Sequence, residues 1–278
     1  MASPKVCVLT GASGTIGYAI AKALKASNVS SSSTHNWHVI IIGRRPPPPS
    51  ITNIDGATPS VLPYDVFLKV DDMTKEDLVT SALNSHFESL QNNDDPKMKA
   101  LNRLDLLINC AGCSLGNEPI VNVSADTFRT VMEINLVVPF ILSRWAFTKF
   151  ATMGDEGGRI INIGSVASES PRLHMVPYAT SKFALTGLTR AFALDGRHLA
   201  QTTKSDATGM VAVCQINPGN VRSSIMSPEE MERREREEGF VEPDEIGMYV
   251  ANVANMPNSV NVLESIAMPT RMPLVGRG

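Results

Sequence analysis

Short runs of apolar residues alternate along the chain with longer stretches in which apolar residues recur at helical spacing. Strands that are apolar throughout, rather than at alternate residues, are typical of a parallel sheet with both faces buried. Helices between successive strands would cover those faces. The pattern therefore predicts an α/β fold, with a doubly wound parallel sheet in a single domain over residues 1–278. The runs that we interpret as strands cover residues 5–10, 37–43, 67–70, 104–110, 159–164, 211–217 and 265–268.

Polar segments interrupt this pattern without ending it. Residues 28–36 are rich in serine, residues 46–60 begin with four prolines, and residues 91–99 are broken by Pro96. A proline run cannot form a helix or a central strand. Strand-like runs resume after each segment, so we interpret all three as surface insertions rather than domain boundaries. Residues 227–239 are different, because they are strongly charged and helix-like.

Composition and charge exclude several classes of function. Apolar residues make up 43 % of the chain and charged residues 19 %, which is enough apolar material for a buried core. The net charge is −3 and the basic residues are scattered, so we expect no nucleic-acid or membrane partner. No uninterrupted apolar run reaches the roughly 18 residues of a transmembrane helix. The first residues do not resemble a secretion signal, and we expect a cytoplasmic protein.

Cys110 and Cys113 form a C-x-x-C pair, a spacing that both metal sites and redox sites use. A structural zinc site needs four ligands, and the chain has no second C-x-x-C or H-x-x-x-H to complete one. We therefore expect no metal site. We interpret the pair as a buried reduced thiol next to a loop thiol.

A glycine-rich turn follows the first strand and precedes the first helix. Gly11, Gly14 and Gly17 stand three residues apart. Glycine permits a tight turn there and lets backbone N–H groups approach a pyrophosphate at the positive end of the helix. The turn therefore predicts a dinucleotide site, although a tight turn without a ligand would use the same residues. Its other predicted cofactor contacts are Ser13, Thr15 and Ile16.

The second strand ends in Gly43-Arg44-Arg45 and carries no acidic residue at that place. An acidic residue there would bind the ribose hydroxyls of NAD. Two guanidinium groups instead suit a 2′-phosphate, through forked charge-assisted hydrogen bonds. Arg44 and Arg45 therefore favour NADP(H) as the cofactor; the alternative is that they only solvate the start of the proline-rich segment.

Tyr178 and Lys182 stand four residues apart, so on a helix they share one face. A neighbouring ammonium group stabilises the phenolate form of a tyrosine, which suits the phenol to general acid–base chemistry. Ser165 follows a strand and lies thirteen residues before Tyr178; its hydroxyl would bind a substrate oxygen as charge develops there. Tyr18 and Lys22 have the same spacing but no such serine, and we reject them.

Together these features resemble the short-chain dehydrogenase/reductase family over residues 6–270, in its compact NADP(H)-dependent type. The resemblance implies a Rossmann-like fold. It also implies that Asn135, Ser165, Tyr178 and Lys182 form a catalytic tetrad. Tyr178 would donate the proton in reduction, and Lys182 would bind the nicotinamide ribose. Ser165 would hold the substrate oxygen, and Asn135 would anchor a water of the proton relay.

The resemblance implies further cofactor contacts at the ends of the strands. Asp72 would lie near the adenine, and Asn109 would steady the central strands. Ser223 stands where the family has a threonine and would still bind the carboxamide. The remaining cofactor contacts would be Ala111, Gly112, Pro218, Gly219 and Val221, together with Tyr178 and Lys182.

The glycine spacing departs from that of the compact members. The chain has T-G-x-x-G-x-x-G, as extended members do, where compact members have T-G-x-x-x-G-x-G. Extended members also carry a larger C-terminal substrate domain, whereas 60 residues follow Pro218 here. We keep the compact type and leave the contact at Gly14 open.

The sequence therefore predicts hydride transfer that interconverts a ketone or aldehyde and an alcohol, with a 3-hydroxy or 3-oxo acid as one candidate substrate. One alternative is an epimerase or dehydratase on the same scaffold. Another is a non-catalytic redox sensor that binds the dinucleotide without turning it over. The tetrad argues against the sensor.

Two further expectations concern the substrate side and self-association. Arg172, His174 and Arg222 are candidate ligands for a carboxylate, and residues 223–242 form a candidate lid or a solvated charged helix. The helices expected at Phe128–Phe147 and Tyr178–Leu199 have apolar faces that this family often uses for self-association, so the resemblance predicts a homodimer or homotetramer.

Overall fold

The computed structural model describes residues 4–27, 36–47, 62–206, 208–223 and 228–274. Each apolar run forms a strand, and together they make one parallel sheet in the order β3-β2-β1-β4-β5-β6-β7. This confirms the doubly wound α/β fold. The strands are β1 (Lys5–Thr10), β2 (Trp37–Gly43), β3 (Val66–Lys69), β4 (Leu106–Asn109), β5 (Gly158–Ile163), β6 (Val211–Pro218) and β7 (Glu264–Ala267).

The strand order reverses beside β1, which pairs with β2 on one side and β4 on the other. Chain segments leaving β1 and β4 therefore diverge to opposite faces of the sheet. In open α/β sheets this point leaves a crevice at the carboxyl ends of the strands, where ligands bind. The fold thus places the glycine-rich turn and the segment after Asn109 at the same edge.

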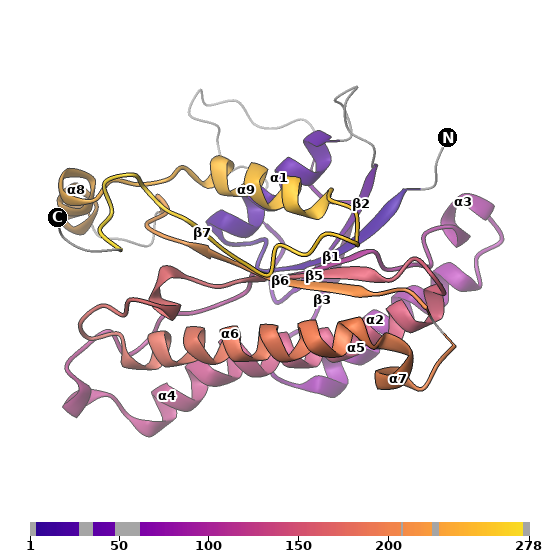
Figure 1. Ribbon diagram of the computed structural model, residues 1–278, viewed down its shortest axis with the longest axis horizontal. Coiled ribbons are helices and arrows are strands. Elements are labelled where there is room, and N and C mark those ends of the chain that lie inside the picture. Colours follow the sequence, from indigo (N-terminus) through magenta and orange to yellow (C-terminus); the bar gives the residue numbers. More distant parts are fainter. Residues whose placement is uncertain (1–3, 28–35, 48–61, 207, 224–227, 275–278) are drawn as a thin grey trace.

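Helices cover both faces of the sheet (Figure 1). α1 (Thr15–Ser27) and α9 (Pro243–Ala254) pack on one face, in an apolar cluster that includes Leu24 and Val250. α2 (Glu76–Gln91), α5 (Val138–Phe150) and α6 (Val176–Arg197) pack on the other. The other helices are α3 (Pro96–Lys99), α4 (Ala125–Met132), α7 (Leu199–Thr203) and α8 (Pro228–Glu237), with 3₁₀ turns at Ile120–Asn122, Ala151–Met153 and Val166–Ser168.

Of the three predicted insertions, the structure describes residues 91–99 in full and the other two only in part. Most of residues 28–36 and 46–60 lie outside the described residues. Residues 91–99 are not a continuous loop: Pro96 opens the short helix α3, and the Asp95 carboxylate accepts a hydrogen bond from the Lys97 N–H. Proline suits a first helical position because its missing N–H would have no partner there. The sequence alone predicts a break at this proline and does not predict the helix that begins there.

α4 and α5 form one continuous helix, joined by a π-helical turn at Glu133–Val137. By length and composition the helix Ala125–Met153 could cross a membrane, although its sequence has no uninterrupted apolar run of that length. In the fold, 56 % of its most apolar window is buried, and the α5 part packs directly on β4 and β5, next to α2. Core helices of this kind meet the same criterion.

Candidate active site

The glycine-rich turn forms a compact cradle between β1 and α1. Gly11 has a φ of +74°, in the region that favours glycine, and a Cβ on Gly17 would lie 2.3 Å from the Gly11 carbonyl oxygen. Gly14 is exposed, and its N–H donates to the Gly11 carbonyl at 2.9 Å. A side chain at Gly17 would collide with the turn, and one at Gly11 would collide with the backbone of Cys110 and Ala111. The turn therefore fits a pyrophosphate held by backbone N–H groups and the α1 N-terminus. Ser13 is also exposed, two residues before α1, which begins with Thr15 and Ile16.

Thr10 connects the glycine-rich turn to the segment that follows β4 by hydrogen bonds. Its hydroxyl oxygen accepts hydrogen bonds from the backbone N–H groups of Cys110 at 3.0 Å and Ala111 at 3.1 Å. Next along the chain, a Cβ on Gly112 would lie 3.3 Å from Asn135 Oδ1 and 3.9 Å from Lys182 Nζ. The predicted cofactor segment and two of the predicted catalytic residues therefore meet.

Asn135 is held in the π-helical turn and is 1 % exposed. Its Oδ1 accepts from the Cys113 N–H at 2.8 Å, and its Nδ2 donates to the Cys113 carbonyl at 2.9 Å. Nδ2 also donates to Ser181 Oγ at 3.0 Å, and that hydroxyl donates to the Tyr178 carbonyl at 2.7 Å. Asn135 thus ties the segment after β4 to α6, through Ser181, a residue that the sequence reasoning did not assign although it lies between Tyr178 and Lys182.

Tyr178 and Lys182 lie on the first turns of α6. Lys182 is buried, and its Nζ donates to the Ile163 carbonyl at 2.8 Å. The same Nζ lies 5.6 Å from the centre of the Tyr178 ring. The ammonium group therefore has a fixed position beside the phenol, at the carboxyl end of β5.

Ser165 follows β5 directly and caps the 3₁₀ turn Val166–Ser168, where its Oγ accepts from the Ala167 N–H at 3.1 Å. Its own N–H donates to Asn217 Oδ1 at 3.1 Å. Asn217 is buried on β6 and immediately precedes Pro218; the sequence pattern does not identify it as a site residue. The serine backbone is therefore held from the neighbouring strand.

Arg44, Arg45 and Asp72 lie where the adenosine part of a dinucleotide would extend. Arg44 and Arg45 are exposed at the end of β2. Hydrogen bonds from the hydroxyl and the N–H of Thr74, at 2.7 and 2.9 Å, are the main causes that lower the pKa of Asp72; the charge of Arg44 contributes less. Asp72 is therefore ionised and fixed near Arg44.

The segment after β6 faces the glycine-rich turn. Pro218 ends the strand, the Gly219 N–H donates to the Ala267 carbonyl at 2.8 Å, and Val221 bridges to Val241. The Ser223 and Thr15 hydroxyls lie 3.4 Å apart, so this segment and α1 border the same space. On the central strands, Asn109 Nδ2 donates to Asn162 Oδ1 at 2.8 Å and to Ser143 Oγ at 3.2 Å, and so links β4 to β5 and to α5.

The rejected pair Tyr18 and Lys22 forms no such site. Tyr18 is 7 % exposed on α1, and Lys22 pairs with Asp244 on α9 at 2.7 Å. The C-x-x-C cysteines are both free thiols, and burial raises the pKa of Cys110 to about 12. In the described part of the chain, no group of three or more His, Cys, Asp or Glu side chains is placed to hold a metal ion.

A cavity of about 690 Å³ lies next to the segment that follows Ser165. Val166 and Ser170 line it, whereas Asn135, Ser165, Tyr178 and Lys182 do not. Arg172 and His174, two of the candidate carboxylate ligands, line it too; His174 has a φ of +62°. Arg222 does not line it. Its guanidinium instead binds Glu242 at 2.7 Å and Glu235 at 2.6 Å, so it is not available for a carboxylate in this cavity. The cavity's outer wall is α8, the helix predicted for residues 227–239; residues 224–227 of the candidate lid lie outside the described residues.

Comparison with known proteins gives the class of this chain. Residues 5–234 match the family described as short chain dehydrogenase. The chain is 30 % identical over 217 residues to an L-fucose dehydrogenase of Oryctolagus cuniculus, an alignment that covers 78 % of this chain and 63 % of that protein. The chain therefore belongs to the short-chain dehydrogenase/reductase family, and it is an oxidoreductase of that family.

Solved structures agree with the fold. An alcohol dehydrogenase of the archaeon Thermococcus sibiricus, complexed with 5-hydroxy-NADP, superposes with a TM-score of 0.70, at 20 % identity, over 97 % of this chain and 98 % of that one. A 4-hydroxyisoleucine dehydrogenase complexed with NADH superposes with a TM-score of 0.66, at 22 % identity, over 95 % and 97 %. Structural neighbours of this chain thus bind nicotinamide dinucleotides of both kinds.

Proposed function

We propose that this chain is an NADP(H)-dependent reductase or dehydrogenase that interconverts a small ketone or aldehyde with an alcohol. The observation that carries the proposal is the position of the Lys182 ammonium, fixed by the Ile163 carbonyl and 5.6 Å from the Tyr178 ring centre. Ser165 lies at the end of the same strand. A phenol, an ammonium and a hydroxyl at one sheet edge suit proton transfer to an oxygen that gains charge.

The residues of this chain have separate roles in that reaction. The glycine-rich turn, Arg44 and Arg45 would hold NADP(H), which supplies or accepts the hydride when bound. Ser165 orients the substrate oxygen, and Tyr178 gives that oxygen its proton during reduction. Lys182 stabilises the phenolate left behind. Asn135 keeps the segment at Cys113 in place against α6.

The preference for NADP(H) rests on Arg44 and Arg45. We expect the double substitution Arg44→Ala, Arg45→Ala to weaken NADPH binding about tenfold or more, since a hydrogen bond to a charged group contributes roughly 1.5–3 kcal/mol. NADH lacks the 2′-phosphate, so its dissociation constant should stay the same. Titration followed by nicotinamide fluorescence measures both constants, and Arg129→Ala on α4 is the matched control. Equal binding of NADPH and NADH by the unsubstituted protein would contradict the preference.

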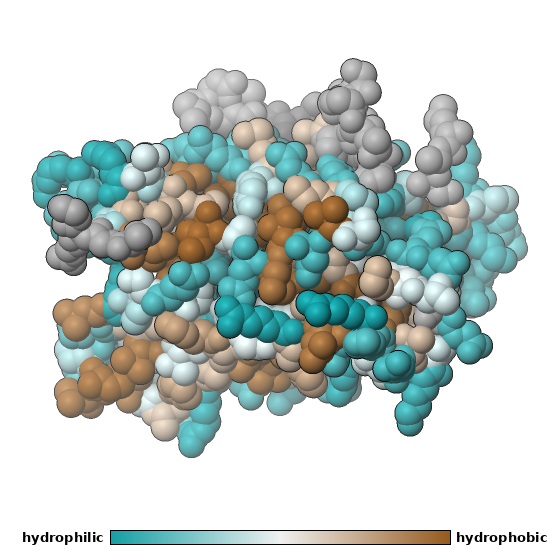
Figure 2. Space-filling model, in the orientation of Figure 1, coloured by the Kyte–Doolittle hydropathy of each residue, from teal (hydrophilic) through white to brown (hydrophobic). Residues whose placement is uncertain are grey.

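Self-association is also proposed, on the basis of apolar side chains exposed on the outer helices. Phe140 on α5 and Phe183 and Leu194 on α6 are 39 %, 48 % and 57 % exposed. Figure 2 shows apolar surface also at the end of the molecule where α4 begins, preceded by Ile120 and Val121. Large apolar side chains exposed on neighbouring helices favour an interface there.

We expect a homodimer or homotetramer at micromolar concentration, and a lower mass for Phe183→Glu, because the substitution places a charge in the proposed interface. Light scattering measures the mass, and Leu78→Glu, an exposed residue of α2, is the control. A mass of one chain for the unsubstituted protein would refute self-association.

A further inference from the structure

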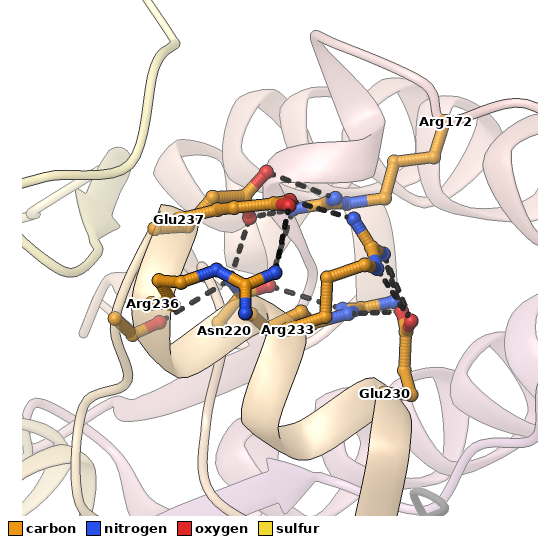
Figure 3. Close-up of polar contacts among 9 residues, drawn as sticks. Arg172, Asn220, Glu230, Arg233, Arg236 and Glu237 are labelled. Atoms are coloured by element: carbon orange, nitrogen blue, oxygen red, sulfur yellow. Dashed lines mark hydrogen bonds and ion pairs between the residues drawn. The ribbon is translucent and has the colours of Figure 1, made fainter.

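A charged network joins α8 to the segment that precedes α6, at the outer wall of the cavity that Val166 and Ser170 line (Figure 3). Its centre is the carboxylate of Glu238, the residue that follows α8. The Arg172 guanidinium binds this carboxylate with two nitrogens, Nη1 to Oε1 at 3.2 Å and Nη2 to Oε2. Asn220 Nδ2 donates to the same Oε2 at 2.7 Å. A forked guanidinium and an amide N–H thus converge on one carboxylate.

Asn220 gives these groups a fixed geometry. It is 4 % exposed and follows Pro218 by two residues. Its Oδ1 accepts from Arg172 Nη2 at 3.2 Å and from Arg234 Nη1 at 3.1 Å. Its Nδ2 also approaches the Gly239 carbonyl, at 3.3 Å. The amide therefore orients the fork of Arg172 from a buried position.

The arginines of the cavity wall are paired with glutamates, and a charged ligand would have to replace one of these glutamates. Arg172, Arg233 and Arg234 line the cavity together with Glu230 and Glu238. Arg233 and Arg234 are paired with Glu230, at 2.8 and 2.6 Å. Arg172 depends on Glu238, because among the described residues its one other side-chain partner is the neutral Asn220. If Glu238 moved away, the half-buried Arg172 would lose its counter-charge.

Glu238 is ionised in this arrangement. Burial acts to raise its pKa, but the hydrogen bonds from Arg172 and Asn220, with the charges of Arg172 and Arg234, bring that pKa below its ordinary value. A substrate that reached Arg172 would therefore compete with the Glu238 carboxylate for the guanidinium group. A neutral substrate would leave a charge unpaired, at a cost in free energy, whereas a substrate carboxylate would restore the pair.

We propose that Arg172 and Asn220 bind the carboxylate of the substrate, and that Glu238 occupies this position until the substrate exchanges with it. The substrate is then a small oxo or hydroxy acid. Its carbonyl or hydroxyl carbon faces Ser165, next to Val166 of the cavity wall, and its chain lies along apolar lining such as Met175 and Met272. This inference rests on the proposed function, because it assigns the substrate class of the same site.

The test uses two unreactive probes of nearly equal shape, butanoate and butanamide. Both are titrated at constant ionic strength against the full chain saturated with whichever dinucleotide it binds more tightly, and binding is followed by calorimetry. Glu238→Gln keeps the shape of the side chain but removes its charge. Glu237→Gln is the matched control, because Glu237 pairs with Arg233 at 2.8 Å and not with Arg172. Arg172→Gln removes the guanidinium.

We expect the unsubstituted protein to bind butanoate more tightly than butanamide. Glu238→Gln should tighten butanoate binding about tenfold, since the competing charge-assisted bonds are lost. Glu237→Gln should leave butanoate binding unchanged, and Arg172→Gln should abolish it. Butanamide should respond to none of the three. Thermal unfolding of each variant confirms that it is folded.

Two outcomes would overturn the proposal: equal binding of butanoate and butanamide, or a butanoate affinity that Glu238→Gln does not raise although the variant is folded. The proposed function is tested separately, by oxidation of the reduced dinucleotide with neutral ketones and aldehydes. Turnover of neutral carbonyls that depends on Tyr178, without carboxylate binding, would refute this inference alone. Specific butanoate binding without any turnover of oxo acids or neutral carbonyls would refute the proposed function alone.

Discussion

Tyr178→Phe is expected to lower the turnover number for carbonyl reduction by a factor of about 10²–10⁴, the usual contribution of a positioned general acid. The substitution removes one oxygen and leaves the ring beside Lys182, whose Nζ lies 5.6 Å from the ring centre. Lys182 remains hydrogen-bonded to the Ile163 carbonyl. The dissociation constant of the dinucleotide should therefore change little, and the loss should be in the turnover number.

Steady-state kinetics and a dinucleotide titration on the same preparation separate these two effects. Tyr249→Phe is the matched control, because Tyr249 is a partly buried tyrosine of α9 that packs against the cluster with Val250. It should keep full activity. Undiminished turnover by Tyr178→Phe would show that the phenol does not transfer the proton, and the proposed mechanism would be wrong.

Gly164→Ala is expected to lower the free energy of unfolding by about 2–4 kcal/mol, the combined cost of overpacking and of a buried polar group losing its partner. A Cβ at this position would lie 2.0 Å from Asn217 Oδ1 and 2.6 Å from Gln215 Nε2. Both amides are buried. Asn217 would have to move, and it would then release the Ser165 N–H.

The buried amides form a chain of hydrogen bonds that ends at the active site. Thr189 Oγ1 donates to Gln215 Oε1 at 3.1 Å, and Gln215 Nε2 donates to Asn217 Oδ1 at 2.8 Å. Asn217 Oδ1 accepts from the Ser165 N–H at 3.1 Å. Because Ser165 is held through this chain, Gly164→Ala should also reduce kcat/KM for carbonyl substrates.

Gly187→Ala is the control for this experiment. Gly187 is exposed on α6, and a Cβ there would meet no atom within 4 Å outside its own helical turn, so alanine should raise the free energy of unfolding by about 0.5–1 kcal/mol. Chemical denaturation of both variants gives the two values. Unfolding free energies that agree for the two alanine variants would contradict the steric argument at Gly164.

Local pattern was enough to predict the sheet and the proximity of Tyr178 and Lys182. The apolar runs at Lys5–Thr10 and Trp37–Gly43 matched β1 and β2 at both ends, because a strand buried on both faces leaves no room for polar residues. Tyr178 and Lys182 were predictable because four residues on a helix return to the same face. Residues 91–99 were harder to predict, because a proline can interrupt a helix and can also begin one, as Pro96 begins α3.

What the sequence by itself determined were features that depend on neighbours a few residues apart: the doubly wound sheet, the glycine-rich turn, and the pairing of Tyr178 with Lys182. The tertiary structure decided the contacts between distant segments. It placed Asn217 behind Ser165, 52 residues away, and Glu238 on Arg172, 66 residues away. It also turned Arg222 away from the cavity. The physical reason is that a hydrogen-bonding or charged side chain has many partners of suitable chemistry along the chain, and only the packing of strands and helices brings one of them within reach.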